Sequence, residues 1–257
     1  MDLGLRGRTA LVCSSTKGLG WASARELASA GARVAVHGRD PEAAAAQAAQ
    51  LPDAVGIGCD LTTEAGAESL AAQALELLGG VDILVLNGPG PAPGRAAGLS
   101  AEEVRAALES LVVAQTTLLQ RLLPPMRERG WGRVVAISST SVEAPIPNLA
   151  LSNMGRPALI SLMKTVASEV AAEGVTLNAV LPGRFDTERV REVNRSTAER
   201  AGLSADEVLA DSLTTVPARR LGEPEELGAA VAFLASERAS FITGTALRVD
   251  GGAVPVL

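Results

Sequence analysis

Residues 13–31, CSSTKGLGWASARELASAG, decide the fold that we expect for this chain. The stretch follows an apolar run, RTALVC at residues 8–13, and it passes through two glycines into an Ala- and Leu-rich segment. In α/β folds, a glycine-rich turn between the first strand and the first helix lets a dinucleotide pyrophosphate approach the helix N-terminus. A glycine pair is weak evidence by itself, so the rest of the chain has to support it.

Short β-branched runs alternate with longer Ala- and Leu-rich segments, a pattern that predicts βαβ units and a parallel sheet. The expected strands are residues 8–13, 32–37, 54–59, 81–86, 132–138, 174–180 and 245–249. The expected helices are residues 18–30, 41–50, 64–78, 100–129, 157–173 and 223–236. The strands read as continuous apolar runs, as strands covered on both faces do. We therefore predict one α/β domain over residues 1–257, a Rossmann-type doubly wound sheet of about seven parallel strands with helices on both faces.

Composition excludes several classes of function. Hydrophobic residues make up 47% of the chain and charged residues 20%, and no apolar run reaches membrane-spanning length. The N-terminal residues lead directly into the first expected strand, so we expect a cytoplasmic protein without a membrane partner. The net charge of −6 argues against a nucleic-acid partner, which would require an excess of Lys and Arg on one face.

The cysteines and the single histidine give no sign of a metal site. Cys13 and Cys59 each end an apolar run, and no second pair of ligands has metal spacing. We expect buried thiols, with neither a disulfide nor a metal ion. His37 lies at the end of the second expected strand, and we interpret it as a strand-end residue rather than a catalytic base.

Residues 184–215 interrupt the alternation, because they are polar, rich in Arg and Glu, and lack a strand. An insertion beyond the carboxyl end of a strand commonly borders the ligand crevice, so we expect a mobile lid on the substrate side. Its side chains include Arg191, Arg195 and Arg200 among the apolar Phe185, Val190 and Leu203. This mixture would suit an anionic carrier-linked acyl chain, although a solvated amphipathic helix is the simpler explanation.

The residues after the second expected strand bear on the choice of cofactor. An acidic residue about 18 residues beyond Gly20 would bind the ribose of NAD, but the chain has Gly38 and Arg39 there. Together with Lys17, which precedes Gly18, Arg39 would place two cations near an adenosine 2′-phosphate. We therefore expect NADP(H) to be favoured over NAD(H). The alternative is that both cations are solvated surface charges.

These features resemble the short-chain dehydrogenase/reductase family, near its 3-oxoacyl-(acyl carrier protein) reductase branch, over essentially the whole chain. The family's Thr-Gly-x-x-x-Gly-x-Gly motif is similar to a run in which the first glycine is replaced by serine. That run consists of Cys13, Ser14, Ser15, Thr16, Lys17, Gly18, Leu19 and Gly20. The family's adenine-contacting Asp matches Asp60, followed by Leu61, and its Asn-Asn-Ala-Gly segment matches the run that contains Asn87.

The resemblance continues in the C-terminal half. Pro182 and Gly183 match the Pro-Gly after the sixth strand, and Thr187 stands where a Thr usually contacts the nicotinamide amide. Residues 219–252, RRLGEPEELGAAVAFLASERASFITGTALRVDGG, are close to a family signature. This region commonly packs in a tetramer interface, so the resemblance implies a homotetramer or a dimer.

Hydride transfer to a carbonyl leaves an alkoxide that must be stabilised and protonated. In the family a Tyr donates the proton, a Lys four residues later lowers the Tyr pKa, a Ser positions the carbonyl, and an Asn supports a water relay. The Ser falls on Ser139, the Tyr on Ser152, the Lys on Arg156 and the Asn on Leu111. The chain contains no tyrosine, and Lys164 lies eight residues past Arg156, which is two turns away along a helix.

Each of these catalytic candidates also has a simpler structural explanation. We expect Pro157 at the first position of its helix, with residues 152–155 as an irregular approach. Ser152 would then cap the helix, Ser139 would make a strand-end hydrogen bond, and Arg156 would be a solvated charge.

Two functions follow. The first is an NADP(H)-dependent oxidoreductase with an atypical active site, acting on a carbonyl or alcohol such as a 3-oxoacyl thioester. In it Ser139 holds the substrate oxygen, Arg156 stabilises negative charge and contacts the nicotinamide ribose, and Ser152 or water delivers the proton. The second is a catalytically impaired, nucleotide-binding homologue with a regulatory or structural role. We favour the first, because the residues expected beside the nicotinamide would be unnecessary for binding adenosine alone.

Overall fold

The computed structural model describes residues 2–255, and within them seven strands form one sheet. The strands are β1 (Thr9–Val12), β2 (Arg33–Gly38), β3 (Ala54–Gly58), β4 (Ile83–Leu86), β5 (Gly132–Ile137), β6 (Val175–Pro182) and β7 (Ala246–Val249). Every neighbouring pair is parallel, and the spatial order is β3-β2-β1-β4-β5-β6-β7. The order reverses beside β1, so the expected doubly wound parallel sheet is confirmed.

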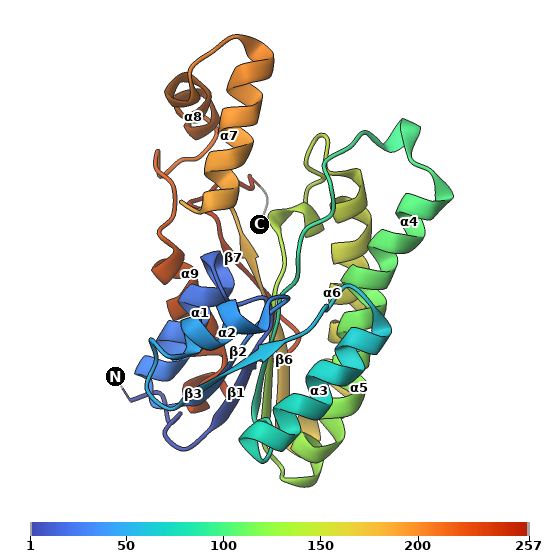
Figure 1. The fold of residues 1–257 in the computed structure, drawn as a ribbon, viewed down its shortest axis with the longest axis vertical. Coiled ribbons are helices and arrows are strands. Elements are labelled where there is room, and N and C mark those ends of the chain that lie inside the picture. Colours follow the sequence, from blue (N-terminus) through green and yellow to red (C-terminus); the bar gives the residue numbers. More distant parts are fainter. Residues whose placement is uncertain (1, 256–257) are drawn as a thin grey trace.

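Helices cover both faces of this sheet (Figure 1). One layer consists of α1 (Gly18–Ser29), α2 (Pro41–Ala48) and α9 (Pro224–Leu234), and the other of α3 (Glu64–Leu78), α5 (Ala114–Glu128) and α6 (Ala150–Val170). Each layer buries its own apolar cluster against the sheet, one including Leu27 and Val231 and the other Leu70 and Leu118. The continuous apolar strands therefore contribute side chains to two cores at once, as a sheet covered on both faces requires.

The predicted helix starts follow from local chemistry. The Asp40 side chain accepts hydrogen bonds from the backbone N–H groups of Glu42 and Ala43, with Pro41 at the first helical position of α2. At α9, the Glu226 side chain accepts the backbone N–H of Glu223 at 2.8 Å. Both arrangements satisfy N–H groups that a helix N-terminus leaves without a partner.

The prediction for Pro157 is wrong. Helix α6 begins at Ala150 and continues through the proline, so residues 152–155 are helical rather than an irregular approach. Leu151, Gly155 and Leu159, which flank the proline along one face, are all buried. Proline removes one backbone hydrogen bond, and the packing of this face maintains the helix in spite of that loss.

The single helix expected over residues 100–129 is also interrupted. The chain forms α4 (Ala101–Leu108), a π-helical turn over Glu109–Val113, and then α5. Leu111 lies in the π turn and is buried against α6, where a β-carbon on Gly155 would lie 2.7 Å from its Cδ1 atom. A π turn is a local insertion that commonly occurs at functional sites, and periodicity does not reveal it.

Residues 184–215 form two helices beyond the carboxyl end of the sheet, α7 (Glu188–Ala201) and α8 (Ala205–Leu213). In Figure 1 they stand above the sheet, at the edge where the strands end. Thr187 caps α7 by accepting the backbone N–H of Val190. This position brings the start of α7 next to the loops that follow the strands.

Candidate active site

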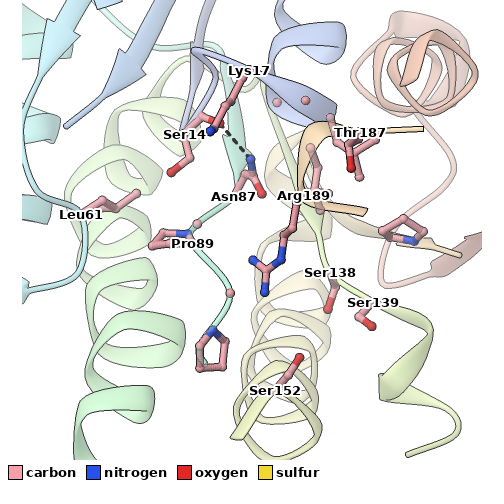
Figure 2. A pocket seen from close by; sticks show the side chains of 18 of the residues that line it. Ser14, Lys17, Leu61, Asn87, Pro89, Ser138, Ser139, Ser152, Thr187 and Arg189 are labelled. Atoms are coloured by element: carbon pink, nitrogen blue, oxygen red, sulfur yellow. Dashed lines mark hydrogen bonds between the residues drawn. The ribbon is translucent and has the colours of Figure 1, made fainter. Parts of the chain in front are cut away.

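A cavity of about 460 Å³ lies at the carboxyl edge of the sheet, between the loops after the strands and the start of α7. The close view in Figure 2 shows side chains from both halves of the chain surrounding it. The sequence-predicted residues that line it are Ser14, Thr16, Lys17, Gly18, Leu19, Gly20, Arg39, Asp60, Leu61, Asn87, Ser139, Ser152, Arg156, Pro182, Gly183 and Thr187. The fold therefore brings together groups that are more than 150 residues apart in the sequence.

Ser15 is the exception among the predicted cofactor-binding residues, because it lies outside the lining. Its side chain is fully buried, where its Oγ donates to the carbonyl of Val12 at 2.6 Å and accepts the backbone N–H of His37 at 3.0 Å. Ser15 therefore ties the glycine turn to β2 from behind and does not face the cavity.

A hydrogen bond to the His37 side chain fixes the backbone of the glycine turn. The backbone N–H of Ser14 donates to Nδ1 of His37 at 2.9 Å, and Nε2 of that ring lies 3.1 Å from the carbonyl oxygen of Cys59. An acceptor at Nδ1 and a donor at Nε2 define a neutral imidazole. Burial lowers the pKa of His37, which favours the same neutral form. The sequence identified His37 as a strand-end residue but did not reveal its hydrogen bonds or its place in the lining.

Two residues of the glycine turn adopt their conformation under tight constraint. Ser14 has φ of +46°, a left-handed conformation that glycine adopts more easily than serine. At Gly20 a β-carbon would lie 2.5 Å from the Ser14 carbonyl oxygen and 2.8 Å from Nδ2 of Asn87. The same Asn87 Nδ2 donates to the Ser14 carbonyl at 3.2 Å. The absence of a side chain at Gly20 therefore permits this close contact between the turn and the loop after β4.

At the other end of the cavity, three polar side chains gather around the end of β5. Ser139 Oγ accepts the backbone N–H of Ser141 at 3.0 Å, at the start of a 3₁₀ turn. Arg156 donates from Nε to the Oγ of Ser152 at 3.1 Å and from Nη1 to the Ser138 carbonyl at 3.1 Å. Nη2 of Arg156 takes no part in these bonds. The sequence-predicted trio of Ser139, Ser152 and Arg156 therefore lines the same cavity, and Figure 2 shows Ser139 and Ser152 beside it.

The environment of Arg156 and Ser152 excludes two of the simpler explanations. Arg156 is partly buried, and burial together with the positive charge of Arg189 lowers its pKa to about 10. It is therefore not a solvated surface charge, although it remains protonated at neutral pH. Ser152 lies inside the first turn of α6 rather than at its N-cap, which is Leu149.

A smaller cavity lies behind this wall, between the loop after β4, the π turn and α6. Gln115 lines it one helical turn beyond Leu111, and its Oε1 atom is buried without a hydrogen-bond partner in the part of the chain that the structure describes. Arg156 borders the same space. Sequence reasoning missed Gln115, because nothing in the local pattern distinguishes it from a surface glutamine.

The structure adds one charged residue, Arg189, to the site and pairs two others, Lys17 and Arg191, with carboxylates. Arg189 lines the cavity and reaches into it from the start of α7 in Figure 2. Lys17, expected near the adenosine phosphate, forms an exposed ion pair with Glu188 at 3.0 Å. Arg191, which the sequence analysis named, pairs with Asp186 instead. The only available signal for Arg189 was its position two residues after Thr187.

Over residues 2–255, no group of three or more His, Cys, Asp or Glu side chains has an arrangement that would hold a metal ion. Cys13 and Cys59 are free thiols, and burial raises the pKa of Cys13 to about 12. In the same residues, no helix has the length and apolarity needed to cross a bilayer.

Fold and site together define a Rossmann-like α/β protein with a glycine turn at a topological switch point. The family described as enoyl-(acyl carrier protein) reductase matches residues 13–254. The human dehydrogenase/reductase SDR family member 4 is 36% identical over 254 residues, covering 96% of this chain and 88% of the relative. The 3-oxoacyl-[acyl-carrier-protein] reductase of Haemophilus influenzae is 33% identical over 249 residues, covering 96% of this chain and 98% of the relative. The chain belongs to the short-chain dehydrogenase/reductase family.

Among solved structures, L-sorbose reductase from Gluconobacter frateurii, complexed with NADPH and L-sorbose, superimposes with a TM-score of 0.95. It is 28% identical, and the match covers the whole of both chains. This family is one of oxidoreductases.

Proposed function

We propose that the protein is an NADP(H)-dependent oxidoreductase that reduces a carbonyl or oxidises the corresponding alcohol. The observation that carries the proposal is the shared cavity, with the glycine turn at one end and Ser139, Ser152 and Arg156 at the other. A nucleotide bound along this cavity would lie between a phosphate cradle and a set of hydrogen-bond donors.

The residues at the glycine turn fit a dinucleotide. Helix α1 begins at Gly18, and among the described residues no side chain caps its N-terminus or places an acidic group in its first turn. Its free N–H groups therefore face the cavity with the positive end of the helix dipole, which attracts a pyrophosphate. At Gly18 a β-carbon would lie 3.9 Å from Cγ2 of Thr187, and Gly20 permits the turn to close on Asn87.

Preference for NADP(H) over NAD(H) is supported by Arg39 at the end of β2. A guanidinium at this position matches a 2′-phosphate, whereas an acidic residue would match an unmodified ribose. The NADPH complex of L-sorbose reductase agrees with this preference. Lys17 contributes less than the sequence suggested, because its ammonium group is already paired with Glu188.

When bound, the cofactor supplies or accepts the hydride. The Ser152 Oγ accepts a hydrogen bond from Arg156, so its own O–H is left to donate to the substrate oxygen. Arg156 adds positive charge where negative charge develops, and Ser139 is placed to hold the same oxygen. A serine hydroxyl is far less acidic than a phenol, so we expect turnover to be slow. After Ser152 donates its proton to the substrate oxygen, a water molecule would protonate the serine again.

The second candidate function is nucleotide binding without turnover, in a regulatory or structural role. It is favoured by the absence of tyrosine from the sequence, which leaves the site without a phenolic proton donor. It requires the glycine turn and Arg39 but gives no role to Ser139, Ser152 and Arg156.

A titration and a substrate panel separate the two functions. NADPH and NADH binding would be measured by fluorescence, and NADPH oxidation would be followed with ketones, 3-oxoacyl thioesters and quinones. Turnover that falls in Arg156→Ala, with NADPH affinity retained, would establish the oxidoreductase. Arg156→Lys serves as the matched variant that keeps the charge. NADPH binding with no turnover across the panel would favour the second function, and no binding of either nucleotide would overturn both.

We also propose that the chain works as a homotetramer or dimer in the cytoplasm, with residues 184–215 as a lid over the substrate. The open edge strand β7 exposes Leu247, and α9 exposes Phe233, so an apolar surface is available there. Light scattering coupled to size exclusion tests the assembly, and a monomer would contradict it.

A further inference from the structure

We infer that the substrate carries a carboxylate, and that Arg189 binds it. This inference rests on the proposed function, because it describes the substrate of the same site. Arg189 is the second residue of α7, after the cap Thr187, and its side chain reaches into the cavity (Figure 2). Its guanidinium lies against the backbone of Gly90, where a β-carbon would be 2.6 Å from both Nη atoms.

The charge of Arg189 is unmatched, unlike that of its neighbours. Lys17 pairs with Glu188, and Arg191 pairs with Asp186 through two hydrogen bonds of 2.8 and 2.7 Å. Over residues 2–255, Arg189 has no hydrogen bond and no ion pair, and although the residue is exposed, its side chain lines the cavity. A guanidinium directed into a cavity without a partner is available for an anion.

The acidic residues of the cavity also leave the charge of Arg189 without a partner. Among the described lining residues, the two carboxylates are Asp60 and Glu188. Asp60 accepts hydrogen bonds from Thr62 beyond β3, and Glu188 is paired with Lys17. No acidic side chain therefore offsets Arg189 at the end of the cavity that Ser139 and Ser152 line.

The second guanidinium at this end is Arg156, which already donates to Ser152 and to the Ser138 carbonyl. Arg156 and Arg189 repel one another, and besides burial the positive charge of Arg189 accordingly contributes to the lowered pKa of Arg156. In the proposed reaction Arg156 faces the oxygen that becomes the alkoxide, which leaves one positive charge for a second group. One guanidinium matches one singly charged carboxylate, so we infer an oxo acid or the corresponding hydroxy acid.

The apolar part of the lining indicates what kind of segment joins the two groups of the substrate. Pro89, Pro91, Leu149 and Phe185 contribute to it, together with Gly90. These residues offer apolar surface and few hydrogen-bonding groups, which suits a short aliphatic segment. The inferred substrate is therefore a short aliphatic acid with a carbonyl or hydroxyl group along its chain.

Phosphates of the cofactor are the other source of negative charge for Arg189, and the test separates the two. Binding of hexanoate and of its neutral analogue hexanamide would be measured by calorimetry on the protein of residues 1–257, saturated with NADP⁺. The variants are Arg189→Gln, the charge-preserving Arg189→Lys, and Arg191→Gln as a control on the same helix. Affinity for NADP⁺ would be measured for each variant.

We expect the wild type to bind hexanoate roughly tenfold or more tightly than hexanamide, as for a hydrogen bond to a charged group. Arg189→Gln should abolish this preference, Arg189→Lys should retain part of it, and Arg191→Gln should retain it fully. Equal binding of the two probes by the wild type, or a preference that survives in Arg189→Gln, would overturn the inference. A loss of NADP⁺ affinity in Arg189→Gln, with the probe preference intact, would assign Arg189 to the cofactor and also overturn it.

The binding test does not depend on turnover, so the two proposals fail separately. A carboxylate preference without NADPH oxidation by any oxo acid or by any compound of the panel would overturn the proposed function and leave the carboxylate site standing. Oxidation of NADPH by neutral ketones, without any carboxylate preference, would do the reverse.

Discussion

Nε of Arg156 donates a 3.1 Å hydrogen bond to Oγ of Ser152, one turn earlier on α6. This bond orients the serine hydroxyl. Because Oγ accepts the hydrogen bond from Arg156, the hydroxyl hydrogen of Ser152 can point into the cavity and donate there. It also places a positive charge next to a weak acid. The pair is the smallest unit of the site that could both donate a hydrogen bond and stabilise an alkoxide.

Replacement of Ser152 by alanine tests this pair. Ser152→Ala should lower kcat about 100-fold, as the loss of one donor to a developing oxyanion does, with NADPH affinity unchanged. Steady-state kinetics and a binding titration measure the two effects. Ser168→Ala is the control, since Ser168 is on the same helix but exposed and bonded to the Thr165 carbonyl. An unchanged kcat in Ser152→Ala would show that water alone delivers the proton.

The double substitution Ser152→Tyr with Arg156→Lys tests the register of the proposed catalytic residues. A phenol is a stronger acid than a serine hydroxyl, and a nearby ammonium lowers its pKa further, so we expect kcat to rise about tenfold or more. Each single substitution should give less than the pair. If the double variant binds NADPH normally but turns over no faster, these positions are not equivalent to the family's Tyr and Lys.

Gly20→Ala should disrupt the glycine turn. The added carbon would lie 2.5 Å from the backbone oxygen of Ser14, which cannot move as a side chain does. We expect a loss of about 1–3 kcal/mol in the free energy of unfolding, together with weaker NADPH binding. Gly98→Ala is the control, because a β-carbon there would meet nothing within 4 Å. Urea unfolding gives the stabilities, and equal stability of the two variants would contradict the close contact.

Ser14→Gly should stabilise the protein by up to about 1 kcal/mol. Ser14 has φ of +46°, and glycine adopts this conformation without the strain that a β-carbon imposes. The greater freedom of glycine in the unfolded chain offsets part of the gain. Ser14→Ala keeps the β-carbon and should leave the stability near that of the wild type. Thermal unfolding measures both, and a Ser14→Gly variant less stable than Ser14→Ala would show that the turn is not strained.

The contribution of His37 to stability should depend on pH. Burial lowers the pKa of folded His37 below its ordinary value of 6.5. The folded state therefore favours the neutral ring, and the stabilisation is fully present above the unfolded pKa and is lost as pH falls below about 6.5. Protonation of Nδ1 would also remove the acceptor for the Ser14 N–H.

Urea unfolding at pH 7.5 and at pH 5, in the wild type and in His37→Gln, measures this contribution. The wild type should exceed His37→Gln in stability by less at pH 5 than at pH 7.5. A difference that stays constant between the two pH values would mean that the ring does not titrate in this range. All other ionisable groups titrate in both proteins, so the comparison isolates the contribution of His37 to the pH dependence of stability.

Much of the fold could be predicted from the sequence, because apolar periodicity and helix-start signals act locally. Asp40-Pro41 predicted the start of α2, whereas Pro157 misled, since the packing of Leu151 and Leu159 outweighs one missing hydrogen bond. The π turn around Leu111 could not be predicted from the sequence for a similar reason. It depends on contacts with α6, which the local pattern does not show.

The candidate site was predicted as a set of positions rather than of orientations. Ser14, Ser15 and Thr16 are consecutive, and only the first and third line the cavity. The direction of Arg189 depends on where α7 begins, and the capping by Thr187 that fixes this start emerges only in the folded chain. Residue types and spacing thus located the chemistry, while tertiary contacts decided which side chains take part in it.

The ion pair between Lys17 and Glu188 joins the glycine turn to the first turn of α7 at the rim of the cavity. Both side chains are largely exposed, so dissolved salt screens their attraction. Added salt should therefore weaken the contact between the glycine turn and α7 at this rim. Release of ligands past this rim should quicken with added salt, even where their contacts deeper inside the cavity stay the same.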